Sequence, residues 1–159
     1  MTNLIIKRAE TEDTQEVFCL IQNTIKSEYK KVYTKNEVEF FSELHSKNAI
    51  AEDIVKRKVY ILIDDDKIMA TATLEKNHIL RVFVEKSCIG QGYGSRIMDF
   101  IENKVSENYS ESILDTSLVA KKFYINRGYF CVGRDSVKIK NNEILEYDIM
   151  KKLLTEGKV

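Results

Sequence analysis

Residues 79–105 read I-L-R-V-F-V-E-K-S-C-I-G-Q-G-Y-G-S-R-I-M-D-F-I-E-N-K-V. The segment begins with an apolar run, Ile79 to Val84, that is typical of a strand. A turn with three glycines follows it, Gly90, Gly92 and Gly94. A helix is then predicted from about Ser95, because apolar residues recur at the spacing of one helical face, at Ile97, Ile101 and Val105.

This order of strand, glycine turn and helix predicts an anion site. Glycines have no Cβ, so the turn can fold tightly and direct several N–H groups at one small anion. The start of the helix adds unpaired N–H groups and the positive end of the helix dipole. We therefore expect a phosphate group to bind at the turn.

Length and composition narrow the class of protein. A chain of 159 residues predicts one domain spanning 1–159. The 25 basic and 25 acidic residues balance, which favours neither a nucleic-acid nor a membrane partner. The three cysteines are widely spaced, and no apolar run is long enough for a signal peptide or a membrane span. We expect a cytoplasmic protein with reduced thiols and no metal, as a monomer or homodimer.

The rest of the chain mixes helical and strand patterns. Helices are predicted after Asp13, over Glu37 to His45 with Asn36 as N-cap, within 46–57, and over Ser117 to Arg127. Strands are predicted over Leu4–Ala9, Lys58–Ile63, Ile68–Leu74, Ser112–Leu114, Tyr129–Lys140 and Ile144–Met150. This order indicates an α/β (α+β) fold with a mixed sheet and helices on its faces.

Two other glycine motifs are excluded by their context. A P-loop requires Lys-Ser or Lys-Thr after its last glycine, and neither occurs here. A dinucleotide fingerprint is nearly matched by Gly90, Gly92 and Ser95, with Asp115 about twenty residues later. It is rejected because only one helix and a terminal hairpin follow Asp115, too few crossovers for that fold.

A second motif identifies the turn. The segment L-D-T-S-L-V-A-K-K-F-Y-I-N-R-G-Y-F starts at Leu114 and, together with I-G-Q-G-Y-G-S, resembles the GCN5-related N-acetyltransferase (GNAT) superfamily. Gly92 and Gly94 match the loop of that family. The helix motif is matched by Ala120, Phe123, Tyr124, Gly128 and Tyr129. One departure is Ile89, which stands where the family has Arg or Gln, so one side-chain contact to the phosphate is lost. Gln91 is one position at which we expect that contact to be replaced.

The resemblance implies the GNAT fold, a twisted, mostly antiparallel sheet of about seven strands with helices on both faces. It also implies acetyl-CoA as acyl donor, with the pyrophosphate on the turn and the pantetheine arm along the main chain of Val82 and Val84. The implied cofactor-binding residues are Val82, Phe83, Val84, Ile89, Gly90, Gln91, Gly92, Tyr93, Gly94, Ser95, Ser117, Ala120 and Tyr124.

By the same resemblance, Tyr124 is the general acid that protonates the thiolate leaving group. Ser117 is expected on the same helical face, two turns earlier, as a helix cap, a pantetheine contact or both. The general base is less clearly marked: Glu75 and His78 lie at strand ends, and Glu75 is the favoured candidate. His45, at the end of a predicted helix on the acceptor side, is expected mainly as a surface residue, with a place in the lining of a substrate pocket as the alternative.

These features predict an N-acetyltransferase that transfers the acetyl group directly to an amine of a small molecule or peptide. The alternative is a protein of the same fold that binds coenzyme A as a sensor or interaction module without turnover. No motif identifies the acceptor, which residues 26–57 and the last hairpin are expected to select.

Overall fold

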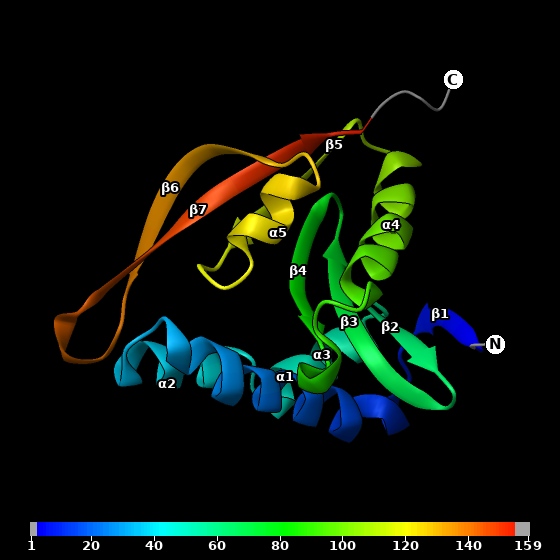
Figure 1. The fold of residues 1–159 in the computed structure, drawn as a ribbon, viewed down its shortest axis with the longest axis horizontal. Coiled ribbons are helices and arrows are strands. Elements are labelled where there is room, and N and C mark those ends of the chain that lie inside the picture. The colour runs from blue at the N-terminus through cyan, green and yellow to red at the C-terminus, as the bar shows by residue number, and fades with distance from the viewer. Residues whose placement is uncertain (1–2, 155–159) are drawn as a thin grey trace.

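The fold is known from a computed structural model, which describes residues 3–154. Within these residues, seven strands form a sheet in the order β1-β2-β3-β4-β5-β7-β6. Helices α1, α2 and α3 lie along one side of the sheet, and α4 and α5 lie on the other (Figure 1). The predicted α/β fold, with a mixed and mostly antiparallel sheet, is confirmed.

The strands agree closely with the sequence pattern. They are β1 (Leu4–Arg8), β2 (Val59–Asp64), β3 (Lys67–Glu75), β4 (His78–Val84), β5 (Glu111–Thr116), β6 (Phe130–Lys138) and β7 (Ile144–Leu153). All neighbouring pairs are antiparallel except β4 and β5, which are parallel.

The main helices are α1 (Thr14–Glu28), α2 (Lys35–Leu44), α3 (Lys47–Val55), α4 (Tyr93–Ser106) and α5 (Lys121–Asn126). Single turns of 3₁₀ helix lie between them, at η1 (Thr11–Asp13), η2 (Tyr29–Lys31), η3 (Lys86–Cys88) and η4 (Lys140–Asn142).

The sheet is buried on both faces at its centre. On one face Ile61 packs with Ile21 and Ile25 of α1, and on the other Leu62 packs with Ile97 of α4. The residues of β2 before Asp64 are therefore hydrophobic one after another, since alternate side chains meet different helix layers.

The sheet opens between β4 and β5. The two strands pair at only two positions, His78 with Ile113 and Ile79 with Leu114. Beyond them β4 stays beside β3 and β5 stays beside β7. The main chain of β4 after Ile79 therefore has no strand partner on its β5 side within residues 3–154, and an extended ligand can pair there.

A bulge reshapes β4 at this opening. Thr71 pairs with Phe83 and Thr73 with Leu80, so β4 has one more residue than β3 between these pairs. Arg81, in the bulge, has a φ of +48°, in the left-handed region that non-glycine residues rarely adopt.

Three helix starts differ from the sequence prediction. Helix α4 begins at Tyr93, two residues before the predicted start at about Ser95, so Gly94 lies in the helix and not in the turn. Thr34, not Asn36, caps α2: its hydroxyl accepts from the N–H of Glu37 at 3.2 Å, and the Glu37 carboxylate accepts from the N–H of Thr34 at 2.9 Å. This capping box satisfies two otherwise unpaired donors. Asn36 instead donates to Glu143, directly after η4, at 2.9 Å, which joins α2 to the tip of the β6–β7 hairpin (Figure 1).

Helix α5 starts at Lys121, four residues later than Ser117, where it was predicted to begin. Ser117 lies in the preceding turn, where its Oγ accepts from the N–H of Ala120 at 3.3 Å. The N–H of Leu118 donates to the hydroxyl of Tyr33 at 2.7 Å, which holds this turn against the segment after α1. The prediction that Ser117 and Tyr124 share one helical face is therefore wrong.

Candidate active site

The glycine turn has the conformation that its sequence predicts. Gly90 has a φ of +87° and Gly92, the N-cap of α4, has a φ of +93°. The first intrahelical bond runs from the N–H of Arg96 to the carbonyl of Gly92 at 3.1 Å. The N–H groups of the three residues between them have no acceptor within the helix, so the end of α4 suits an anion.

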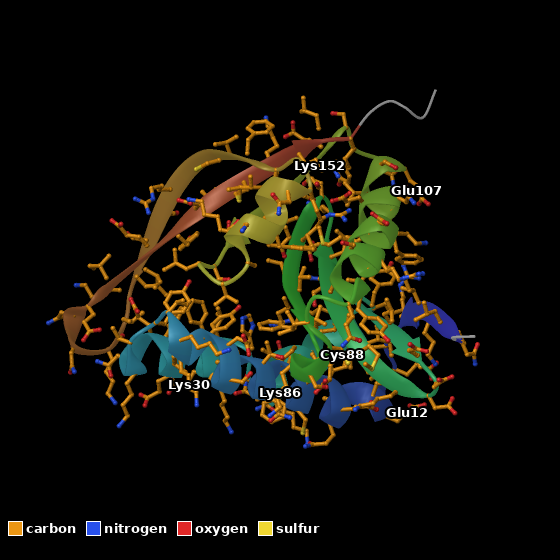
Figure 2. The ribbon with its side chains drawn as sticks, in the orientation of Figure 1. Glu12, Lys30, Lys86, Cys88, Glu107 and Lys152 are labelled. Atoms are coloured by element: carbon orange, nitrogen blue, oxygen red, sulfur yellow. The ribbon has the colours of Figure 1, made fainter. Side chains whose placement is uncertain are left out.

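Helix α4 is held at this end by a hydrogen bond and lies close to α5 and β4. The hydroxyl of Tyr93 donates to Asp64 of β2 at 2.6 Å. A Cβ added at Gly94 would lie 3.4 Å from the ring of Phe123 and 3.5 Å from the side chain of Val84. The turn therefore lies directly against α5 and the end of β4. Figure 2 shows Lys86 and Cys88 on the loop that leads into it.

A cavity of about 420 Å³ lies where β4 and β5 separate. Five parts of the chain line it: α1–η2, α2, β4, the β5–α5 segment and the β6–β7 hairpin. The lining residues are Tyr29, Phe40, Phe41, Leu44, His45, Ile79, Leu80, Arg81, Val82, Phe83, Asp115, Thr116, Ser117, Ala120, Tyr124, Val137, Leu145 and Tyr147.

Tyr124 is buried in the wall of this cavity, with 5% of its surface exposed. Burial raises the pKa of its phenol above the ordinary value, so the hydroxyl stays protonated at neutral pH. The hydroxyl has no hydrogen-bond partner within residues 3–154. It is therefore free to donate to a ligand in the cavity.

Arg81 is held by two partners in the opposite wall. Its guanidinium forms an ion pair with Asp53 of α3, and its Nε donates to Nδ1 of His45 at 3.1 Å. Burial, and then the nearby Arg81 charge, lower the pKa of His45 to about 3. The neutral ring accepts at Nδ1 and carries its proton on Nε2, so His45 is a hydrogen-bond donor in the cavity rather than a base. The expectation of a surface position is wrong.

Asp115 is the acidic residue of the cavity lining. It lies 3.7 Å from Nε2 of His78, too far for a hydrogen bond but close enough for an ion pair when His78 is protonated, and it raises the pKa of that histidine. The side chain of Asp115 is 43% exposed. The carboxylate is therefore available to a cation in the cavity.

The structure brings most, but not all, of the predicted site residues to this cavity. Val82, Phe83, Ser117, Ala120 and Tyr124 line it. The turn residues Ile89–Ser95 and the side chain of Val84 lie outside the lining, at the adjoining end of β4.

Glu75 is not brought to the cavity. It lies at the end of β3 and forms an ion pair with Lys58. The hydrogen bond and charge of Lys58 lower the pKa of its carboxyl. Since a base for an ammonium group needs a pKa nearer neutrality, Glu75 has neither the position nor the proton affinity for that role.

Sequence reasoning missed several residues of the cavity. Arg81 interrupts the apolar run Ile79 to Val84 with a charge, and this interruption could have marked it as a candidate site residue. Asp115 was considered only as part of a dinucleotide motif. No sequence pattern placed Tyr29, Phe41 and Tyr147 in the site, because nothing in the sequence shows that η2, α2 and β7 meet there.

Two kinds of feature are absent from residues 3–154. No group of three or more His, Cys, Asp or Glu side chains is arranged to hold a metal ion. None of the helices there combines the length and apolarity needed to span a membrane.

Comparison with known proteins agrees with the geometry. The family model described as an acetyltransferase (GNAT) domain matches residues 29–148. A GCN5-related N-acetyltransferase from Rhodopseudomonas palustris superposes with a TM-score of 0.86 at 21% identity, over 94% of this chain and 95% of that one. No curated protein sequence matches the chain significantly.

Two further solved structures share the fold and hold a ligand. PaiA N-acetyltransferase from Thermoplasma acidophilum, in complex with coenzyme A, has a TM-score of 0.75 at 16% identity, over 95% of this chain and 99% of that one. YncA from Salmonella typhimurium, with its cofactor acetyl-CoA, has a TM-score of 0.72 at 12% identity, over 97% and 95%. With a family model that covers most of its length, the chain belongs to the GNAT acetyltransferase family.

Proposed function

We propose that this chain transfers the acetyl group of acetyl-CoA directly to an amine held in the cavity. One observation carries the proposal: the glycine turn, the unpaired edge of β4 and the free hydroxyl of Tyr124 adjoin one another at the opening of the sheet. The turn suits a pyrophosphate, the edge of β4 suits a pantetheine arm, and the hydroxyl of Tyr124 suits a thioester.

The pyrophosphate is assigned to residues 90–95, where the N–H groups at the start of α4 are unpaired. The side chains of Ile89 and Gln91 are exposed beside it, so main-chain donors supply most of the contacts. The pantetheine arm is assigned to the free edge of β4, with Val82 contributing its N–H and carbonyl groups and Val84 its N–H, since the carbonyl of Val84 already accepts from the hydroxyl of Thr24 at 2.9 Å. A main-chain N–H there also stabilises the negative charge that develops on the thioester oxygen.

The reaction balances without a metal or a redox step. The acceptor enters as an ammonium ion and loses one proton to water before it attacks. Its nitrogen then bonds to the carbonyl carbon, and the bond between that carbon and sulfur breaks. The nitrogen gives up a second proton as the amide forms, and the thiolate gains one to leave as free coenzyme A, so the sum releases one proton.

Tyr124 is assigned to the departing sulfur. An ordinary thiol has a pKa of about 8.5, below that of a phenol at about 10, and burial raises the pKa of Tyr124 further. Complete proton transfer is therefore uphill. We expect the main effect to be the O–H···S hydrogen bond formed as charge develops on sulfur, with solvent restoring any proton that is transferred.

Replacing Tyr124 with Phe tests the proposal, because it removes one hydroxyl and keeps the ring. We expect kcat for acetyl transfer to fall about a hundredfold, with the Kd for coenzyme A, measured by calorimetry, nearly unchanged. Tyr109→Phe, at an exposed tyrosine outside the cavity lining, is the matched control and should keep full activity.

An unchanged kcat in Tyr124→Phe would remove Tyr124 from the mechanism. If the wild-type chain binds coenzyme A but acetylates no amine, it is a coenzyme A sensor with the same fold. Absence of coenzyme A binding would contradict the proposal altogether.

A further inference from the structure

The acceptor side of the cavity is mainly apolar. Apart from Arg81 and Asp115, its outer wall consists mainly of aromatic and aliphatic side chains from α1, α2 and the β6–β7 hairpin. They are Tyr29, Phe40, Phe41, Leu44, Val137, Leu145 and Tyr147. Such a wall favours an apolar ligand body over a polar one.

The aromatic part of this wall is already packed. The ring of Tyr29 lies edge-on to Phe41 with centroids 5.0 Å apart, and stacks on Phe83 at 5.9 Å. Phe40 lies edge-on to Phe41 at 5.6 Å. Because these rings support one another, an acceptor ring would meet a preformed surface and little side-chain freedom would be lost on binding.

The size of the cavity agrees with an acceptor that carries a ring. An apolar cavity of about 150 Å³ is enough for a benzene ring. The 420 Å³ here leaves room for one such ring beside the acetyl end of the donor.

The charged residues of the cavity favour a ligand with a positive charge over one with a negative charge. Arg81 is already paired with Asp53 and bonded to His45, and its side chain is only 13% exposed. A ligand carboxylate would therefore have to compete with Asp53. Among the described residues, the carboxylate of Asp115 faces only His78, at 3.7 Å, which is a cation only when it is protonated. The cavity therefore offers one carboxylate without a permanently charged partner, and no unpaired cation.

We propose that the acceptor is a primary amine on an apolar, ring-bearing body, with its ammonium group paired to Asp115 and its ring on the wall formed by Tyr29, Phe41 and Leu145. This inference rests on the proposed function. Amino acids are disfavoured, because their carboxylate would lie near Asp115 and find no free cation. Linear polyamines are disfavoured as well, because one carboxylate and an apolar wall leave their other charges unpaired.

Three amines of known structure test the proposal on the full chain: phenethylamine, phenylalanine and spermidine. Phenethylamine and phenylalanine share a ring and an amine and differ in one carboxylate. We expect kcat/KM for phenethylamine to exceed that for either of the others by about tenfold or more, a difference of about 1.4 kcal/mol. A higher kcat/KM for phenylalanine or spermidine would overturn the proposal while leaving the acetyltransferase function intact.

The Asp115→Asn variant tests the ammonium partner. Asp115 raises the pKa of His78, so assays are run at about pH 8.5, well above the ordinary histidine pKa of about 6.5, to limit the charge on His78. We expect KM for phenethylamine to rise about tenfold and KM for acetyl-CoA to stay unchanged. Glu146→Gln is the matched control, because this exposed carboxylate on β7 lies outside the cavity lining, and it should change neither constant. An unchanged KM for phenethylamine in Asp115→Asn would overturn the assignment of Asp115.

Calorimetry separates failure of this inference from failure of the proposed function. Phenethylamine is titrated into wild-type and Asp115→Asn protein saturated with coenzyme A. Binding that weakens about tenfold in the variant supports the site even if no acetyl group is transferred. Equal binding to both proteins, or none to the wild type, overturns it.

Discussion

His45 is a neutral histidine held between a charge and a ring. Its Nδ1 accepts from Arg81, and its ring lies edge-on to Phe83 with centroids 5.4 Å apart. Protonation would place a second positive charge beside Arg81 in a partly buried site, which is why its pKa is lowered to about 3. The same contacts support Arg81 in the bulge of β4, so one histidine connects α2 to the strand on which the donor is proposed to bind.

This lowered pKa gives His45 a defined effect on stability. In the unfolded chain a histidine has a pKa of about 6.5, so between that value and about 3 the unfolded state binds a proton that the folded state does not. The contribution of His45 is thus present above about pH 6.5 and lost as the pH falls below it, with a slope of up to about 1.4 kcal/mol per pH unit.

The variant His45→Asn keeps an acceptor for Arg81 and does not titrate. We expect urea unfolding of this variant to show a weaker loss of stability between about pH 6.5 and about pH 4.5 than the wild type. His78 is the opposite case: its interaction with the Asp115 carboxylate, 3.7 Å away, raises its pKa, so its contribution is present at low pH and is lost as the pH rises through that raised pKa. His78→Asn should therefore not reduce the acid loss, and equal slopes for His45→Asn and the wild type would contradict the buried, neutral histidine.

At the scale of elements, the glycine turn and α4 depend on backbone conformation more than on side-chain contacts. Gly92 occupies the N-cap with a positive φ, whereas Gly94 lies within the helix and has no such constraint. The reasons for glycine at the two positions therefore differ. Gly92 is needed for its conformation, whereas a Cβ at Gly94 would meet Phe123 and Val84 at ordinary contact distance, so that position does not require glycine.

Replacing each glycine with alanine separates these reasons. Gly92→Ala forces a Cβ into the left-handed region, and we expect it to lower the free energy of unfolding by about 1–2 kcal/mol. Gly94→Ala adds a methyl group at ordinary contact distance from Phe123, 3.4 Å, in a helix that favours alanine. It should be neutral or stabilising by up to about 1 kcal/mol. Urea unfolding of the two variants measures both values, and a more destabilising Gly94→Ala would contradict the assigned roles.

At the scale of the whole molecule, the sequence predicted what local patterns determine. The glycine turn, the stripe of α4 and the apolar run of β2 each depend on neighbours a few residues away, and they were correctly placed. The start of α5 was misplaced because Tyr33, far away in the sequence, accepts a hydrogen bond from Leu118 and holds the turn that contains Ser117. Such a tertiary contact overrides local helix propensity.

The acceptor cavity was the least predictable part, for the same reason. Segments 26–57 and the last hairpin were expected to select the acceptor, and residues from both line the cavity. Neither the ion pair of Arg81 with Asp53 nor the free carboxylate of Asp115 follows from spacing, because each depends on which segments meet across the opening between β4 and β5. Figure 1 shows α2 beneath the far end of the β6–β7 hairpin, which forms one edge of the sheet.

The central claim is that this opening holds acetyl-CoA and an amine together for direct transfer. The most direct test follows an isotopic label at the acetyl carbonyl by NMR, with acetyl-CoA, phenethylamine and the full chain in one tube. The account predicts that the label moves from the thioester to an amide, with one free coenzyme A released for each amide formed. A label that stays in the thioester, or that appears as free acetate at the same rate with and without the amine, would contradict it.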